Sequence, residues 1–179
     1  REITNAYISV NNDIVTFTFI GDGFIKYQIR NMVGFLVSTH SNLCYGFADA
    51  AAMIGCSYEN VEYLSLTEEG IDLFEERMTE KIKAMHEKYT QLIVLTDLMS
   101  ATPYNIACRV IYHLGFNEDY VVAGTNLGLF MELVISSQFE EDVRVLAEKA
   151  EASGKDSICL IHPASYYGVQ EEAEEEEDF

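Results

Sequence analysis

The residues of this chain that could do chemistry together are His40 and Asp97, each of which follows a short apolar run. Residues 33–37 contain no polar side chain and precede His40 closely, and residues 91–96 end directly before Asp97. A carboxylate that accepts a hydrogen bond from one imidazole nitrogen leaves the other nitrogen as a nucleophile, which can attack phosphorus. The pair therefore predicts phosphoryl transfer through His40, provided that the fold brings the two side chains together.

The apolar runs are typical of strands that a parallel sheet buries on both faces. After residue 32 predicted strands alternate with predicted helices, the strands at 33–37, 61–66, 91–96 and 120–124 and the helices at 42–54, 71–89, 102–114, 129–136 and 140–152. This alternation predicts an α/β fold, with a doubly wound, mostly parallel sheet of order 2-1-3-4 and helices on both faces. In that order the first and third strands are neighbours, so His40 and Asp97 meet at the carboxyl ends of the strands.

Two further expectations concern the elements around this core. A short fifth strand is predicted at residues 157–162, where it pairs antiparallel because only the turn at 154–156 separates it from a helix broken at Gly154. The helix at 71–89 carries an apolar stripe at three- and four-residue steps, which we assign to the core. His86 lies beside that stripe and is predicted to be a solvated surface residue.

The loops after the first and third strands carry candidates for a phosphate site. Ser41 is expected to cap the helix after His40, and Thr102 is expected to cap the next helix, with Pro103 at its first position. Helix N-termini offer unpaired N–H groups and partial positive charge to phosphoryl oxygens. Phosphoryl transfer needs mainly positioning and charge stabilisation, so we expect neither a metal ion nor a cofactor. The sequence has no Walker loop and no kinase Gly-rich loop.

Composition limits the class of partner. The net charge is −19 over 179 residues, and leaving out the seven acids at 171–178 still gives −12. A body this acidic is a poor match for nucleic acid or anionic lipid, which bind clustered Lys and Arg. The four cysteines form no CxxC pair, and neither a signal peptide nor an apolar run of 18 residues is found, so we expect a soluble cytoplasmic protein. The acidic end is expected to be solvated and disordered.

Residues 1–31 have a different pattern from the rest of the chain. Residues 6–10 and 14–20 alternate around Asn11-Asn12-Asp13, which predicts a β-hairpin, and a helix-like stretch comes after it. The sequence GDGFIKYQIRNMVG resembles the carboxyl-terminal motif of TruA-type tRNA pseudouridine synthases, over about residues 1–34. In that family the catalytic aspartate lies in another half of the protein, and the arginine matching Arg30 supports the active site, so the resemblance implies a non-catalytic fragment. If the helix-like stretch of this fragment continued, residues 32–37 would be helix. We favour a strand there, because Gly34 weakens a helix.

A second resemblance covers residues 32–162. The motifs VSTHS, VLTDLMSATPYN and AGTNL resemble the IIA component of mannose-type (mannose, fructose and sorbose) sugar phosphotransferase systems. The resemblance implies that His40 is phosphorylated by the carrier HPr on its outer ring nitrogen and passes the group to a IIB component. It also implies that Asp97 orients His40 and that Thr102 replaces a phosphate-contacting serine.

The same resemblance implies partners and an oligomeric state. Members of this family are homodimers in which a carboxyl-terminal strand crosses to the sheet edge of the partner, and residues 157–162 match that strand. The link to the membrane is indirect, through the IIC/IID permease. The IIA domain contacts only phosphate and two protein partners, so the transported sugar cannot be read from it.

The chain departs from the family at two places. It has Thr39-His40-Ser41 where the family commonly has THG, and it has Ser100-Ala101 where the family has a Gly-Gly pair. The Ser-Ala pair is closer to the gluconate-type branch than to the mannose branch. A side chain at a position that needs positive φ would narrow the phosphate pocket. Ser41 and Ser100 are nevertheless candidates for phosphate binding, and Thr39 and Asn126 are candidates for the wall of the cleft.

Three parts of the chain are therefore expected: a hairpin and helix fragment at 1–31, a IIA phosphocarrier domain at 32–163 and an acidic tail at 164–179. The leading function is a phosphotransferase of a sugar uptake system. A similar domain donates phosphate to dihydroxyacetone kinase, and only the partner distinguishes the two. Two different classes of function also remain open: a remnant of an RNA-modifying enzyme, suggested by residues 1–31, and a non-catalytic scaffold.

Overall fold

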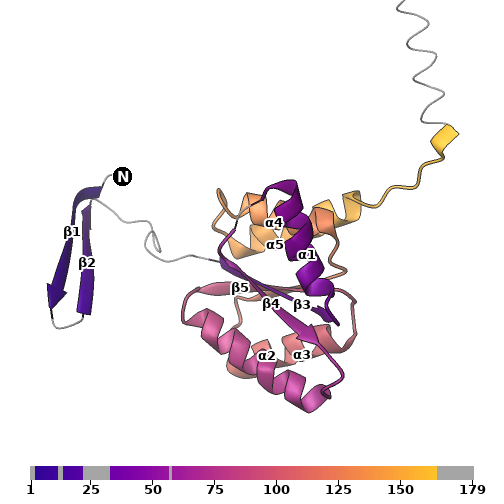
Figure 1. Ribbon diagram of the computed structural model, residues 1–179, viewed down its shortest axis with the longest axis horizontal. Helices are drawn as coiled ribbons and strands as arrows, with labels where there is room; N and C mark the ends of the chain where they lie inside the picture. The colour runs from indigo at the N-terminus through magenta and orange to yellow at the C-terminus, as the bar shows by residue number, and fades with distance from the viewer. Residues whose placement is uncertain (1–2, 12–13, 22–32, 57, 165–179) are drawn as a thin grey trace, which may run out of the picture.

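A computed structural model describes residues 3–11, 14–21, 33–56 and 58–164 (Figure 1). The helix-like stretch predicted after residue 21 and almost all of the acidic tail lie outside these ranges. As predicted, strands β1 (Ile3–Asn11) and β2 (Ile14–Gly21) pair antiparallel in a hairpin. Figure 1 shows this hairpin standing apart from the α/β body that contains the remaining elements.

The body is built on a four-stranded parallel sheet. Its strands are β3 (Val33–His40), β4 (Val61–Leu66), β5 (Gln91–Thr96) and β6 (Tyr120–Ala123), in the order β4-β3-β5-β6. This confirms the predicted order 2-1-3-4 and the prediction of a strand, not a helix, at residue 33. Residues 33–39 are all buried, as expected for a central strand covered on both faces.

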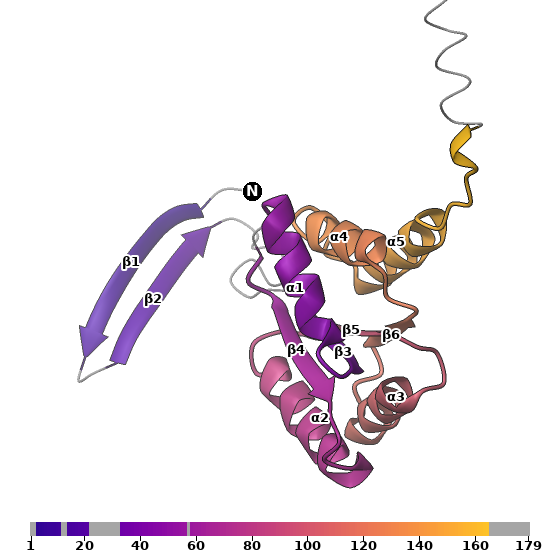
Figure 2. The same cartoon turned by 45° about the vertical axis from the view of Figure 1, so that its right-hand side comes forward.

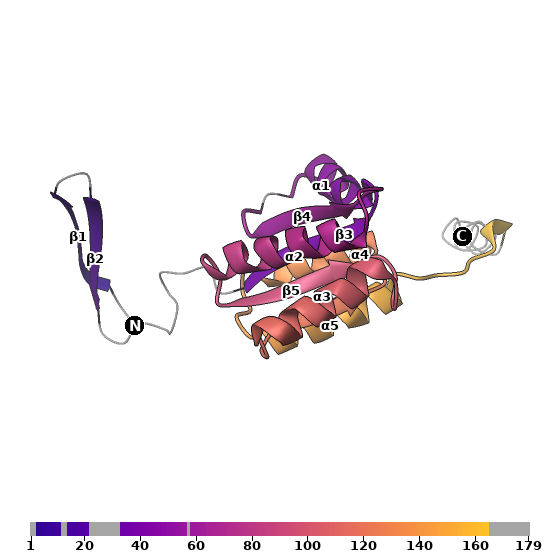
Figure 3. The same ribbon diagram turned by 90° about the horizontal axis from the view of Figure 1, so that it is seen from below.

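Helices cover both faces of the sheet (Figures 2 and 3). One face carries α1 (Leu43–Ile54), α4 (Leu127–Ser136) and α5 (Val143–Asp156), and the other carries α2 (Ile71–His86) and α3 (Thr102–Leu114). Each face therefore has its own hydrophobic core. The predicted stripe of α2 lies in the second core, where Phe74, Met78, Ile82 and Met85 are fully buried. None of the described helices is long and apolar enough to cross a membrane.

Gly34 is required by close packing inside β3. A Cβ atom at this position would lie 2.5 Å from Cδ2 of Tyr89 and 2.9 Å from Cδ2 of Leu92. Both neighbours are buried, so they have little room to move away. Gly34 therefore suits a strand over which the Tyr89 ring packs closely.

The carboxyl-terminal elements differ from the prediction in two ways. The predicted break at Gly154 is wrong: α5 continues to Asp156, because Gly154 is buried where a Cβ would lie 3.0 Å from Cδ1 of Leu129. Residues 158–162 form no strand within the described chain, since α5 takes up the turn that would have folded them back. The apolar side chains of Ile158, Leu160 and Ile161 are exposed instead.

Candidate functional site

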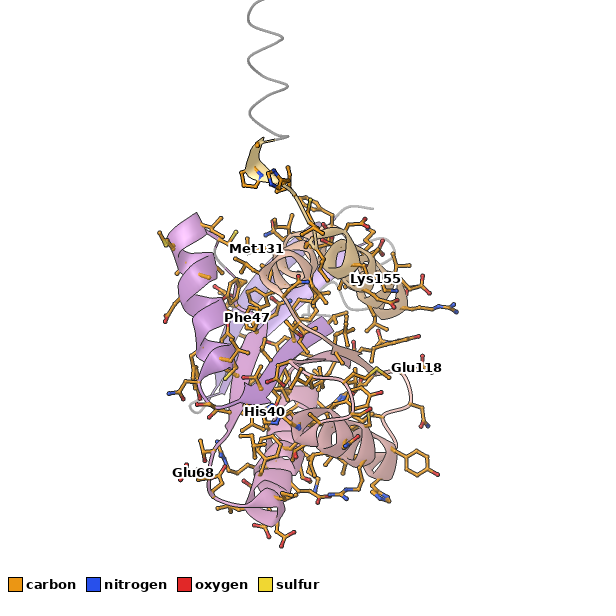
Figure 4. The ribbon with its side chains drawn as sticks, turned by 90° about the vertical axis from the view of Figure 1, so that its right-hand side faces the viewer. His40, Phe47, Glu68, Glu118, Met131 and Lys155 are labelled. Carbon is orange, nitrogen blue, oxygen red and sulfur yellow. The ribbon has the colours of Figure 1, made fainter. Side chains whose placement is uncertain are left out.

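The structure brings His40 and Asp97 together at the carboxyl end of the sheet. Their strands β3 and β5 are neighbours, with Ser38 paired to Thr96, so both residues leave the sheet side by side. His40 Nδ1 lies 2.8 Å from Asp97 Oδ2, and the same oxygen accepts a hydrogen bond from the backbone N–H of His40 at 3.0 Å. Figure 4 shows His40 at the end of β3, between α1 and the layer of α2 and α3.

The contacts of Asp97 define the tautomer of His40. A carboxylate oxygen accepts hydrogen bonds, so Nδ1 carries a proton and Nε2 holds the lone pair. The second carboxylate oxygen, Oδ1, accepts from the backbone N–H of Leu98 at 3.0 Å. The Asp97 side chain is 10% exposed and the His40 side chain is 42% exposed. The arrangement therefore presents a nucleophilic nitrogen to solvent from a fixed ring.

Two serines flank this pair in backbone conformations that favour glycine. Ser41 has φ of 51° and Ser100 has φ of 63°, and both residues are exposed. The N–H of Ser41 donates to the carbonyl of Leu66 at 2.8 Å, which ties the loop after β3 to the end of β4. The left-handed region costs a non-glycine residue about 1–2 kcal/mol, so strain is concentrated in the two loops beside the histidine.

The predicted capping residues are wrong at both helices. Asn42, not Ser41, is the N-cap of α1, and its side chain makes no cap hydrogen bond. Ala101 is the N-cap of α3, which places Thr102 at the first helical position and Pro103 at the second. The N-cap of α1 thus lies one residue after the predicted position and that of α3 one residue before it, and each stands directly after a serine with positive φ, Ser41 or Ser100. Neither N-terminus therefore uses a side chain of its N-cap residue to bind its own N–H groups.

The two candidates for the cleft wall have structural contacts. Thr39 is fully buried, and its hydroxyl accepts a hydrogen bond from the N–H of Cys44 at 2.8 Å in the first turn of α1. Asn126 is the N-cap of α4: its Oδ1 accepts from the N–H of Leu129, and its Nδ2 donates to the carbonyl of Gly154 at 2.8 Å. The structure thus uses Thr39 to hold α1 and Asn126 to join α4 to α5.

Sequence reasoning missed two residues that support the loops of the site. The Asn105 side chain donates to the carbonyl of Ser100 at 2.8 Å, which holds the loop after β5 against α3. Thr125 donates to the carbonyl of Thr96 through both its N–H and its hydroxyl, at 3.0 and 2.9 Å. The closing Asn of the TPYN segment was the available signal for Asn105, and the motif AGTNL, which contains Thr125, was the available signal for Thr125.

A second pair of the same residue types lies at the opposite end of the sheet. His86 Nε2 lies 2.8 Å from Asp119 Oδ2, and Asp119 Oδ1 accepts from the N–H of Leu92 near the start of β5. The imidazole stacks on Phe116 with ring centroids 3.6 Å apart, and its side chain is 11% exposed. The prediction that His86 is a solvated surface residue is wrong, because the side chain pairs with Asp119 and stacks on Phe116. The sequence pattern does not reveal these contacts, since both partners are distant in sequence.

One ionisable group in the first turn of α1 is buried beside the site. Burial raises the pKa of the Cys44 thiol above its ordinary value, although the hydrogen bond with Thr39 acts in the other direction. Cys44 is fully buried, so it contributes to packing as a neutral thiol.

Comparison with solved structures finds the same fold in sugar phosphotransferase proteins. The component EIIA from Streptococcus agalactiae is 22% identical, with a TM-score of 0.65 over 72% of this chain and 97% of that chain. The mannose/sorbose specific IIA subunit from Enterococcus faecalis is 23% identical, with a TM-score of 0.65 over 73% and 96%. The IIA protein associated with the fucose utilization operon of Streptococcus pneumoniae is 25% identical, with a TM-score of 0.61 over 76% and 96%.

Sequence comparison agrees for the α/β body. No curated protein matches this chain. Residues 34–151, however, match the family model EIIA-man, described as the fructose IIA component of the phosphotransferase system. The match begins at residue 34, so the resemblance of residues 1–34 to pseudouridine synthases stays a prediction. Since the matched residues make up more than half of the sequence and contain both His40 and Asp97, the chain belongs to the EIIA-man family of phosphotransferase system IIA components.

Proposed function

We propose that this chain is a phosphocarrier that accepts a phosphoryl group on His40 from phospho-HPr and passes it to a IIB component during carbohydrate uptake. The observation that carries the proposal is the 2.8 Å contact between His40 Nδ1 and Asp97 Oδ2, on a histidine side chain that is 42% exposed. Membership of the IIA family supports the same conclusion. The connection to the membrane is indirect, through the IIC/IID permease.

The chemical step depends on the tautomer. The lone pair of His40 Nε2 attacks phosphorus, and the Nε2–P bond forms while the bond from phosphorus to the donor breaks. The proton on Nδ1 stays in place, where the Asp97 carboxylate stabilises the positive charge that the ring gains. In the second transfer a nucleophile of IIB attacks phosphorus, and the electron pair of the Nε2–P bond returns to Nε2.

The phosphoryl oxygens are stabilised by the N-termini of α1 and α3 together with the hydroxyls of Ser41, Ser100 and Thr102. These helices begin directly after the two loops that hold His40 and Asp97, and their first-turn N–H groups carry partial positive charge. The loops themselves, at 41–42 and 97–101, contain no Lys or Arg. Hydroxyls and N–H groups must therefore supply the stabilisation that comes from these loops.

The functional unit is a homodimer in which residues 158–162 of one copy add to the β6 edge of the other. β6 pairs only with β5 in the described sheet, so its outer edge has N–H and C=O groups available for a further strand. Ile158 is 79% exposed and Leu160 is 100% exposed, which is costly for a segment that stays in water. A shared edge would bury both features together.

Phosphorylation by purified enzyme I, HPr and phosphoenolpyruvate tests the proposal, with intact mass as the readout. We expect one acid-labile phosphoryl group per chain, its loss in His40→Ala, and its retention in His113→Ala, which removes an exposed histidine of α3. A folded protein that takes up no phosphate would contradict the carrier function and favour a non-catalytic scaffold. Transfer from the phosphorylated chain to dihydroxyacetone kinase, and not to IIB, would make the chain a donor to that kinase.

A further inference from the structure

Two buried hydroxyl groups lie near the carboxyl ends of β3 and β5. Ser38 and Thr96 are both 0% exposed, and in the described part of the chain neither Ser38 Oγ nor Thr96 Oγ1 has a hydrogen-bond partner. By contrast, the buried hydroxyl of Thr39 accepts a hydrogen bond from the N–H of Cys44. A buried hydroxyl without a partner destabilises a fold, and an apolar side chain of the same shape would remove that cost. The two hydroxyls therefore need an explanation other than packing.

Both hydroxyls belong to the face of the sheet that carries His40. Leu36 of β3 and Val94 of β5 pack in the core between the sheet and the helices α2 and α3. Side chains alternate along a strand, so Ser38 and His40 lie on the same face as Leu36. For the same reason Thr96 lies on the face of Val94, and it is the partner of Ser38 in the pairing of β3 with β5. Residues two apart on a strand have Cα atoms roughly 7 Å apart, so the two hydroxyls form a polar layer next to His40.

The proposed reaction creates a positive charge beside this layer. When Nε2 of His40 takes up the phosphoryl group and Nδ1 keeps its proton, the ring becomes cationic. Asp97 offsets this charge, and its side chain is only 10% exposed, so water contributes little on that side of the ring. The oxygen of a hydroxyl carries partial negative charge, and its hydrogen can rotate away from a cation. In surroundings of low dielectric constant such a dipole stabilises a nearby charge more than it would in water.

The state of the two hydroxyls suits them to this task. A hydroxyl that is held in a hydrogen bond has a fixed direction, so it cannot turn when a charge appears next to it. Within the described residues Ser38 Oγ and Thr96 Oγ1 are free of such a bond, so both can turn their oxygen lone pairs toward the ring. The cost of burying them without a partner would then be offset in the phosphorylated state.

We propose that the hydroxyl dipoles of Ser38 and Thr96 stabilise the positive charge of the phosphorylated His40 ring. Neither hydroxyl gives up a proton or bonds to phosphorus: the Nε2–P bond forms, the bond to the donor breaks and the proton on Nδ1 stays in place. Ser38 and Thr96 act only through the ring of His40, so they are positioning residues. The inference rests on the proposed phosphocarrier function and adds two residues that set how strongly the chain holds its phosphoryl group.

The test compares wild type with Ser38→Ala, Thr96→Val and the double variant, each of which loses a hydroxyl and gains no bulk. Each chain is mixed with phospho-HPr and followed to equilibrium by intact mass, which gives the rate and the equilibrium constant of phosphoryl transfer. Thr79→Val is the matched control, because the Thr79 hydroxyl donates to the carbonyl of Glu75 at 2.8 Å within α2. Urea unfolding gives the stability of each variant.

We expect the equilibrium constant for phosphoryl uptake to fall about threefold in each single variant and about tenfold in the double variant, because the charged product loses its stabilising dipoles. Thr96→Val should also raise the urea midpoint, since it removes a buried hydroxyl that has no partner among the described residues. Thr79→Val should leave the equilibrium constant of wild type unchanged.

Two results would overturn the inference. A lower rate with an unchanged equilibrium constant would mean that the hydroxyls affect only the geometry of His40. A lower urea midpoint for Thr96→Val would mean that its hydroxyl has a structural role. If wild type itself takes up no phosphate from HPr, the proposed function fails, whereas an active wild type whose variants have the same equilibrium constant contradicts only the role of Ser38 and Thr96.

Discussion

One carboxylate oxygen of Asp97 bonds His40 twice, at the backbone N–H (3.0 Å) and at ring Nδ1 (2.8 Å). The first contact fixes the residue at the end of β3 and the second fixes its ring. The position and the tautomer of the imidazole are therefore set by the same atom. A change at Asp97 should therefore alter the reactivity of His40 through both the position and the tautomer of its ring.

Asp97→Asn should slow phosphorylation of His40 by on the order of 10²–10⁴-fold, because an amide can donate to Nδ1 and move the ring proton to Nε2. The rate of phosphoryl uptake from phospho-HPr is the measurement. Asp119→Asn is the matched control, since it alters the corresponding His86 pair. It should lower the free energy of unfolding and leave the uptake rate unchanged. Equal rates for Asp97→Asn and wild type would contradict the role of Asp97.

Ser100→Gly should stabilise the protein by about 0.5–1 kcal/mol, because it relieves the strain at φ of 63° at some cost in unfolded-state entropy. Ser100→Ala keeps the Cβ atom and removes only the hydroxyl, so it should not stabilise. Urea unfolding measures both. If the hydroxyl contacts the phosphoryl group, both variants should slow phosphorylation to a similar extent. A stabilised Gly variant with the wild-type rate would remove Ser100 from the phosphate site.

Gly34→Ala should destabilise the fold by several kcal/mol, about 2–4, because the new methyl group overlaps the buried Tyr89 ring. Gly46→Ala is the control: nothing lies within 4 Å of its added Cβ on α1, so helix propensity should give about 0.5–1 kcal/mol of stabilisation. Chemical unfolding of both variants gives the comparison. Similar stabilities would show that the packing of Tyr89 over β3 is wrong.

Glu62 should make the stability depend on pH below neutrality. Burial alone would raise the pKa of this carboxyl, but hydrogen bonds from Lys81 (2.9 Å) and Lys88 (3.0 Å) lower it below the ordinary value of 4.5. A lowered pKa means that the stabilisation is present above pH 4.5 and is lost as the pH falls through the folded-state value. The difference in unfolding free energy between wild type and Glu62→Gln should therefore shrink on acidification. Glu118→Gln, at an exposed carboxyl, serves as the control.

The sheet and the meeting of His40 with Asp97 could be predicted because they depend on local patterns. Apolar runs mark the buried strands, and the order of strands and helices leaves few ways to connect them. The resulting order of strands in the sheet makes β3 and β5 neighbours, so their carboxyl ends lie side by side. Residue 34 is predicted as strand for the same reason, although the preceding residues favoured a helix.

The errors arise where a distant contact decides the local structure. The N-caps of α1 and α3 each lie one residue from the predicted position, directly after Ser41 and Ser100, whose positive φ no capping motif reveals. α5 passes through Gly154 because Leu129 packs against it. Only 11% of the His86 side chain is exposed, because it pairs with Asp119, which lies much later in the chain. These contacts join residues that only the folded chain brings together.

The most direct test of the phosphocarrier function identifies the atom of the protein that carries phosphate. ³¹P–¹⁵N NMR of the chain phosphorylated by HPr, with ¹⁵N-labelled histidine, distinguishes Nε2 from Nδ1 through the coupling to phosphorus. We expect a single phosphohistidine, at His40 Nε2, with Nδ1 still protonated against Asp97. Phosphate on Nδ1, on another histidine or on a serine hydroxyl would contradict the proposed role of His40.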